Sequence, residues 1–271
     1  MSETAQNPGI ETPLTKREWS TKLFLGFLGI ISSLYAIVLI YHISKPPGTV
    51  QVDEGFLERC RQICLQYGLV STGHVRKDAE AYLQVVQTQR LTEGMAEVLA
   101  DSNFRVVESQ SHPLRQRAAP EFSLPDDSGT TQSLKELGHD RPLVVVFYLG
   151  YGCSHCVAQL LALEKDLHYF RELDADIVAI SQDSPEHTSE RYKEYGRFSF
   201  PVLSDADNTV AEIWSVYEPE TDEHDESRDH GTFVVDRNGQ VIWAVRGKEP
   251  FLDSKSLLHV IAASQGLLPA R

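Results

Sequence analysis

The chain has 271 residues, of which 41% are hydrophobic and 24% charged, and this is enough for one sizeable globular core. Its formal net charge of -14 argues against a nucleic-acid partner, because such a partner requires a basic face. The four cysteines are too few for a disulfide-built scaffold, and they form two close pairs, Cys60 with Cys64 and Cys153 with Cys156. Local pairs of this kind are typical of redox or metal chemistry, or of plain burial.

The N-terminal part has the pattern of a membrane anchor. Residues 1–22 form a polar tail, and residues 23–43 contain no Asp, Glu, Lys or Arg. About 20 such residues cross a bilayer as a helix, and the stretch exceeds the apolar core of a cleaved signal peptide. Basic residues are more frequent before the span than after it, which predicts a single-pass protein with its N-terminus in the cytoplasm. All that follows is then extracytoplasmic, in a periplasm-like compartment where disulfides persist.

A short linker, 44–52, leads into a small helical segment, 53–116. Its first helix carries an apolar stripe at helical spacing that consists of Phe56, Cys60, Ile63, Cys64 and Tyr67. Shorter helices are predicted at 75–86 and 91–99. Cys60 and Cys64 are either an accessory disulfide or relay, or two small buried hydrophobic residues. The second interpretation is favoured, because one helix is a strained place for an internal bridge.

Residues 117–271 alternate between strand and helix patterns. The predicted strands are 143–148, 176–181, 232–235 and 240–245, and the predicted helices are 154–170, 185–195 and 252–263. The last two strands form a hairpin around a turn at 236–239. The order predicts a βαβ unit followed by an antiparallel ββα unit on one central mixed sheet, an α/β fold.

Cys153, Ser154, His155 and Cys156 follow an apolar strand directly and open a helix. The free N–H groups and positive end of a helix stabilise a thiolate, and only the thiolate attacks peroxides or disulfides. His155 either favours that thiolate when protonated or is a solvated residue at a helix start. Inert buried thiols are the structural alternative. A zinc half-site is disfavoured, because no second Cys-X-X-Cys supplies the remaining ligands.

Several blocks in order resemble the peroxiredoxin-like (AhpC/TSA, redoxin) families of the thioredoxin superfamily. They are APEFSLPD from Ala119, FYLGYGCSHCVAQLLAL from Phe147, DIVAISQDSPE, FPVLSDADNTVAEIW and GTFVVDRNGQVIW. The resemblance covers about 117–265 and implies a thioredoxin-like fold. It places Cys156 at the peroxidatic position of the Thr-X-X-Cys motif and Cys153 at the position of the Thr. His230 falls where peroxidases of the family place an Arg and thioredoxins a cis-Pro.

Three functions follow from this resemblance, and peroxide reduction through a Cys153–Cys156 disulfide is preferred. The alternatives are thiol–disulfide exchange with a protein disulfide, in which Cys153 attacks first, and a copper chaperone like the Sco proteins, which would use Cys153, Cys156 and His230. The predicted catalytic residues are Cys153, Cys156, His155 and His230. The preferred function requires a thiol reductant that the sequence does not identify, and it implies no organic cofactor and no resident metal.

Overall fold

The computed structural model describes residues 24–37, 54–86, 91–138, 140–220 and 227–268. The chain divides into two compact units, Met1–Gln51 and Val52–Arg271, and each is described by itself. In the first unit residues 24–37 form a helix with exposed apolar side chains. Within the described ranges, no helix combines the length and apolarity needed to cross a membrane. The predicted tail 1–22, the linker 44–52 and both ends of the predicted span, 23 and 38–43, lie outside the described residues.

The second unit is built on a five-stranded mixed sheet of order β5-β4-β3-β8-β9. β3 pairs in parallel with β4 and β4 with β5, whereas β8 pairs antiparallel with both β3 and β9. The predicted βαβ and ββα units on one sheet are therefore confirmed. The strands are β3 (Leu143–Phe147), β4 (Asp176–Ser181), β5 (Val202–Ser204), β8 (His230–Val235) and β9 (Val241–Gly247).

The central strand β3 is buried at every position, as expected for a strand covered on both faces. Val144 and Val146 belong to the core cluster that includes residues of α6 (Ser154–Glu172) and α9 (Ser254–Ser264). The alternate side chains of β3 pack in a second cluster, which contains Trp214 and Leu134. The period of two along the strand thus divides the core into two layers.

Short elements border this sheet. They are β1 (Ser123–Pro125), β2 (Thr131–Ser133), α5 (Leu134–Leu137), α7 (Pro185–Tyr195), α8 (Thr209–Ile213), β6 (Tyr217–Glu218) and β7 (Ser227–Arg228). The sequence predicts α7 at its observed bounds, because Ser184 caps it and Pro185 occupies its first position. Most of the other elements span only two to five residues, too few for hydrophobic periodicity to reveal.

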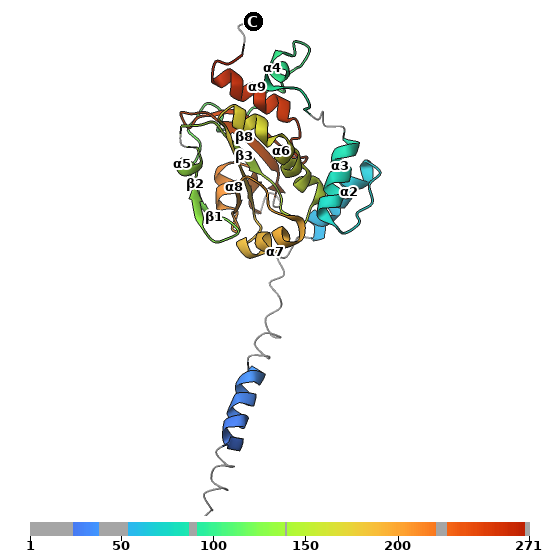
Figure 1. Cartoon of the computed structure of the whole chain (residues 1–271), viewed down its shortest axis with the longest axis vertical. Coiled ribbons are helices and arrows are strands. Elements are labelled where there is room, and N and C mark those ends of the chain that lie inside the picture. Colours follow the sequence, from blue (N-terminus) through green and yellow to red (C-terminus); the bar gives the residue numbers. More distant parts are fainter. Residues whose placement is uncertain (1–23, 38–53, 87–90, 139, 221–226, 269–271) are drawn as a thin grey trace, which may run out of the picture. The chain divides into compact units, whose positions relative to one another are not determined.

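The helical segment contains α2 (Glu54–Gln66), α3 (Val75–Val85) and α4 (Met95–Ala100). α3 makes the most extensive contact, with α6, and α4 packs on α9 (Figure 1). Ala79, Tyr82 and Leu83 of α3 are buried in the same cluster as the apolar face of α6. The segment therefore shares its core with the sheet domain, and the boundary at 116/117 stays a prediction.

Candidate active site

Asp183 holds the loop between β3 and α6 through a hydrogen bond to the loop backbone. The backbone N–H of Tyr151 donates to the Asp183 carboxylate at 2.7 Å, and Asp183 is buried. Gly150 has a φ of +106°, and a Cβ there would lie 2.8 Å from the same carboxylate. A side chain at this position would therefore meet both backbone strain and a clash. Burial raises the pKa of Asp183, although the Tyr151 N–H opposes that shift.

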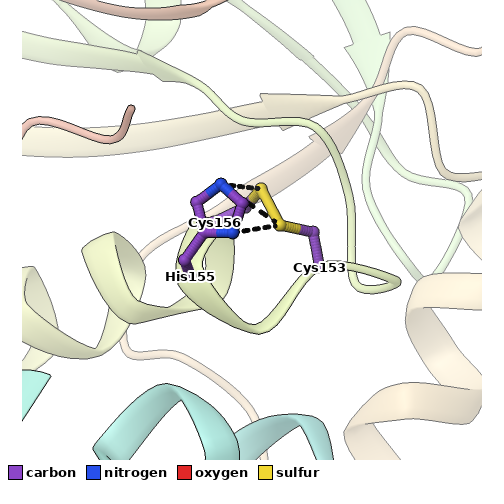
Figure 2. A group of neighbouring side chains, drawn as sticks. All are labelled: Cys153, His155 and Cys156. Atoms are coloured by element: carbon purple, nitrogen blue, oxygen red, sulfur yellow. Dashed lines mark hydrogen bonds between the residues drawn. A yellow bond between two sulfur atoms is a disulfide. The ribbon is translucent and has the colours of Figure 1, made fainter. Parts of the chain in front are cut away.

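Cys153 and Cys156 are joined by a disulfide at the start of α6 (Figure 2), with their Cα atoms 5.4 Å apart. Cys153 is the N-cap residue and Cys156 lies in the first turn. Both are buried, at 1% and 0% exposure. Sequence reasoning predicted this pair at a helix start, and the structure places it there. The first turn of a helix carries free N–H groups and a partial positive charge, which favour a thiolate at a position such as Cys156.

His155 lies against the two sulfur atoms (Figure 2). Its Nδ1 is 2.9 Å from Cys153 Sγ, and its Nε2 is 3.6 Å from Cys153 Sγ and 3.9 Å from Cys156 Sγ. The residue is 1% exposed, so the interpretation of His155 as a solvated side chain is wrong. Burial lowers its pKa to about 4. At neutral pH the ring is therefore uncharged and offers a lone pair instead of a positive charge.

His230 is the first residue of β8, the strand that neighbours β3, and its side chain lies near His155. Its ring centroid lies 5.7 Å from that of His155, and the residue is 2% exposed. Its Nδ1 is 3.1 Å from the Lys248 carbonyl oxygen, whereas its Nε2 has no hydrogen-bond partner among the described residues. Burial, reinforced by His155, lowers its pKa to about 3. All four predicted site residues are thus neighbours.

The helical segment adds two residues that sequence reasoning did not assign to the site. The Tyr82 ring of α3 has its centroid 5.9 Å from that of His155. Cys64 of α2 is a buried free thiol. Its Sγ lies 3.7 Å from the hydroxyl of Ser154, the residue that follows Cys153. The side chain of Cys60 lies outside the described part of the chain. The apolar stripes predicted that these helices are buried, but a stripe carries no information on which surface covers it.

The arrangement can make and break one disulfide in a dry environment beside two neutral imidazoles. The ligand atoms of Cys153, His155 and Cys156 lie within 4.8 Å of one another, so the opened pair is also a candidate metal-binding group.

Comparisons with known proteins identify the family and the fold of the chain. Residues 116–244 match the model of the AhpC/TSA family. A protein of Mycobacterium tuberculosis named as a peroxiredoxin is 30% identical over 135 residues, which are 46% of this chain and 80% of that protein. Peroxiredoxin Bcp of Escherichia coli is 34% identical over 99 residues, which are 36% of this chain and 62% of that protein.

The crystal structure of peroxidoxin BcpB from Mycobacterium tuberculosis superimposes with a TM-score of 0.50 at 26% identity, over 58% of this chain and 100% of that one. This confirms the predicted thioredoxin-like α/β fold. The helical segment, by contrast, precedes the matched residues. Because the Mycobacterium tuberculosis relative is matched over most of its length, the chain belongs to the peroxiredoxins of the AhpC/TSA family and is a thiol-dependent peroxidase.

Proposed function

We propose that the chain is a membrane-anchored, extracytoplasmic peroxidase in which Cys156 attacks the peroxide and Cys153 resolves the product. The carrying observation is the disulfide between Cys153 and Cys156 at the start of α6. Cys156 matches the peroxidatic cysteine of the family motif, and it lies in the first helical turn, where N–H groups favour a thiolate.

The cycle has three steps. The Cys156 thiolate attacks one oxygen of the O–O bond, becomes a sulfenic acid and releases an alkoxide that takes up a proton as the alcohol. Cys153 then attacks the Cys156 sulfur, the disulfide forms and water leaves. Two external thiols reduce the disulfide and are themselves oxidised to a disulfide. The second step requires Cys153 to lose its proton, and Nδ1 of neutral His155 is 2.9 Å away to accept it.

Burial favours peroxide over a protein disulfide as the oxidant. Both cysteines are at most 1% exposed, and residues of α2 and α3 contact Ser154 and His155 between them. A peroxide can diffuse into such a site, whereas exchange with a protein requires that a strand reach the sulfur in line with the disulfide. The reductant meets the same obstacle, so we expect disulfide reduction to require movement of the covering helices.

Placement at a membrane is the remaining part of the proposal. It is supported by residues 23–43, which lack charged side chains, and by the excess of basic residues before them. An extracytoplasmic compartment also suits a disulfide-forming site. Fusing a reporter that is active only in the cytoplasm to the C-terminus tests the orientation, and activity of that reporter would contradict it.

The chemistry is tested by comparing Cys153→Ser with Cys156→Ser during hydrogen peroxide consumption with a dithiol reductant. We expect Cys156→Ser to lose turnover and sulfenic acid formation, and Cys153→Ser to form the sulfenic acid without closing the disulfide. The reverse pattern, with Cys156→Ser trapping mixed disulfides and no peroxide turnover in the wild type, would support thiol–disulfide exchange instead.

A further inference from the structure

Opening the disulfide leaves two sulfur donors beside two imidazoles, in a site from which water is excluded. Cys153, His155 and Cys156 are each at most 1% exposed and His230 is 2% exposed. Two thiolates and two neutral imidazoles are the donor set of closed, four-coordinate zinc sites. The sequence disfavoured zinc because it lacks a second Cys-X-X-Cys. The fold places His155 against both sulfurs, and the His230 ring centroid lies 5.7 Å from that of His155.

We propose that the reduced protein binds one Zn²⁺ ion through the sulfurs of Cys153 and Cys156 and the Nε2 atoms of His155 and His230. This site goes beyond the peroxidase activity, because it assigns a second, metal-bound state to the same residues.

The distances around His155 fit such an ion. Bond lengths of about 2.3 Å to sulfur and about 2.0 Å to nitrogen at a tetrahedral angle separate the donors by about 3.6 Å. The His155 Nε2 atom lies 3.6 Å from Cys153 Sγ and 3.9 Å from Cys156 Sγ. Once the S–S bond is reduced, the two sulfurs need only separate by rotation about their side chains to complete three corners of the tetrahedron.

Within the described part of the chain, His230 has the tautomer and the unpaired ring nitrogen that a fourth donor requires. Its Nδ1 lies 3.1 Å from the Lys248 carbonyl, and this bond places the hydrogen on Nδ1 and the lone pair on Nε2. Metal-binding histidines commonly donate their second ring N–H to a backbone carbonyl in this way. The Nε2 atom is buried without a hydrogen-bond partner among the described residues, which carries a desolvation cost that a bound cation would recover.

Charge balance selects zinc over Cu(I). Two thiolates cancel the double charge of Zn²⁺, whereas Cu(I) would leave one net negative charge in a site that is almost fully buried. The tyrosines nearby, Tyr82 and Tyr67, provide no compensating cation. Cu(I) also requires fewer ligands than the four that the proposed site would supply.

The bound ion would hold both thiolates until a peroxide oxidises them, and it would then be released. In that reaction a peroxide takes two electrons from the two zinc-bound thiolates, the O–O bond breaks, and the S–S bond forms. With two protons taken up, the products are the disulfide, the alcohol, water and free Zn²⁺. This release step depends on the proposed peroxide chemistry, whereas zinc binding does not.

The experiment uses the full chain reduced under anaerobic conditions, with Zn²⁺ titrated against a chromogenic chelator. We expect one ion per chain, no binding by the oxidised protein, and affinity lowered at least about 10-fold to 100-fold in His155→Ala and in His230→Ala. Co²⁺ in place of Zn²⁺ should give the thiolate charge-transfer band and tetrahedral visible bands. His259→Ala is the matched control, because His259 is also buried but bonds Val98 in α4, away from the cysteines, and it should bind zinc as the wild type does.

The site is excluded if the reduced wild type fails to bind Zn²⁺ at one ion per chain, or if His155→Ala and His230→Ala bind as tightly as His259→Ala does. Tight binding of Cu(I) with none of Zn²⁺ would also overturn the proposal. His155→Gln and His230→Gln repeat the test with less loss of volume, should the alanine variants fold poorly. Peroxide turnover is measured separately with a chelator present. Zinc binding without turnover would support the zinc site and contradict the proposed peroxidase mechanism.

Discussion

The residues that carry the redox chemistry and the residues that cover them come from different regions of the chain. The strand–loop–helix that holds Cys153 and Cys156 lies within the residues that match the AhpC/TSA family, whereas α2 and α3 lie before them. Both regions contribute to one buried core, and α3 packs directly on α6. The redox cysteines are therefore local to a helix start, while a segment distant in sequence supplies side chains that bury the site.

The largest expected effect comes from removing Tyr82, the α3 side chain whose ring lies beside His155. Tyr82 is 1% exposed, so we expect Tyr82→Ala to lower the free energy of unfolding by about 3–5 kcal/mol. It should also speed reduction of the disulfide by glutathione. Tyr82→Phe keeps the ring and serves as the control in denaturant unfolding and thiol-release assays. If Tyr82→Ala loses stability but reduction is no faster, α3 does not control access to the site.

A second test uses acid. The pKa of His155 falls from 6.5 in the unfolded chain to about 4 in the folded one, because burial disfavours the charged ring. Between these values the unfolded chain binds the extra proton, so stability decreases as the pH falls below about 6.5, by roughly 3 kcal/mol in total. His230 acts in the same direction, since its pKa is lowered to about 3.

Urea unfolding of the wild type and of His155→Asn at about pH 7 and about pH 4.5 measures this effect. The variant should show the smaller change in stability between the two conditions, because it has lost one of the buried imidazoles whose pKa burial lowers. An equal change in both proteins would mean that His155 is not titrating between the folded and unfolded states.

A third test concerns the loop that precedes Cys153. Gly150→Ala combines a φ of +106° with a Cβ 2.8 Å from the Asp183 carboxylate, so we expect a loss of about 1–3 kcal/mol and slower peroxide turnover. Gly129→Ala is the matched control, because Gly129 has a φ of +81° with open space around its Cβ position. Equal effects of the two substitutions on stability and turnover would show that the Asp183 contact does not position the loop.

The smallest expected effect belongs to Cys64. If this thiol is a small buried hydrophobic residue, Cys64→Ala lowers stability by about 1 kcal/mol and leaves the steady-state peroxide rate with a dithiol reductant unchanged. If it is a relay to the main disulfide, the same variant slows reductive turnover, and mass mapping of the oxidised wild type finds a bridge between Cys64 and Cys153.

The strongest local patterns in the sequence already determined much of the framework. The apolar run at 143–148, the capped helix at 185–195 and the Cys-X-X-Cys after a strand each depend on neighbours in sequence, and each is confirmed. Periodicity and capping act within a few residues, so they can be recognised without the fold. The same applies to the proximity of Cys153 and Cys156. Two residues that are three positions apart at the start of a helix lie on the same side of its first turn.

The tertiary structure alone decided what surrounds those sulfurs. Burial of His155, and with it the loss of its charge, depends on α3, whose Tyr82 is 73 positions away in sequence. The lone pair of His230 is directed by the Lys248 carbonyl, just after β9. The loop before Cys153 is held by Asp183, two residues after β4. Desolvation and hydrogen-bond direction are properties of a packed environment, so no local pattern encodes them.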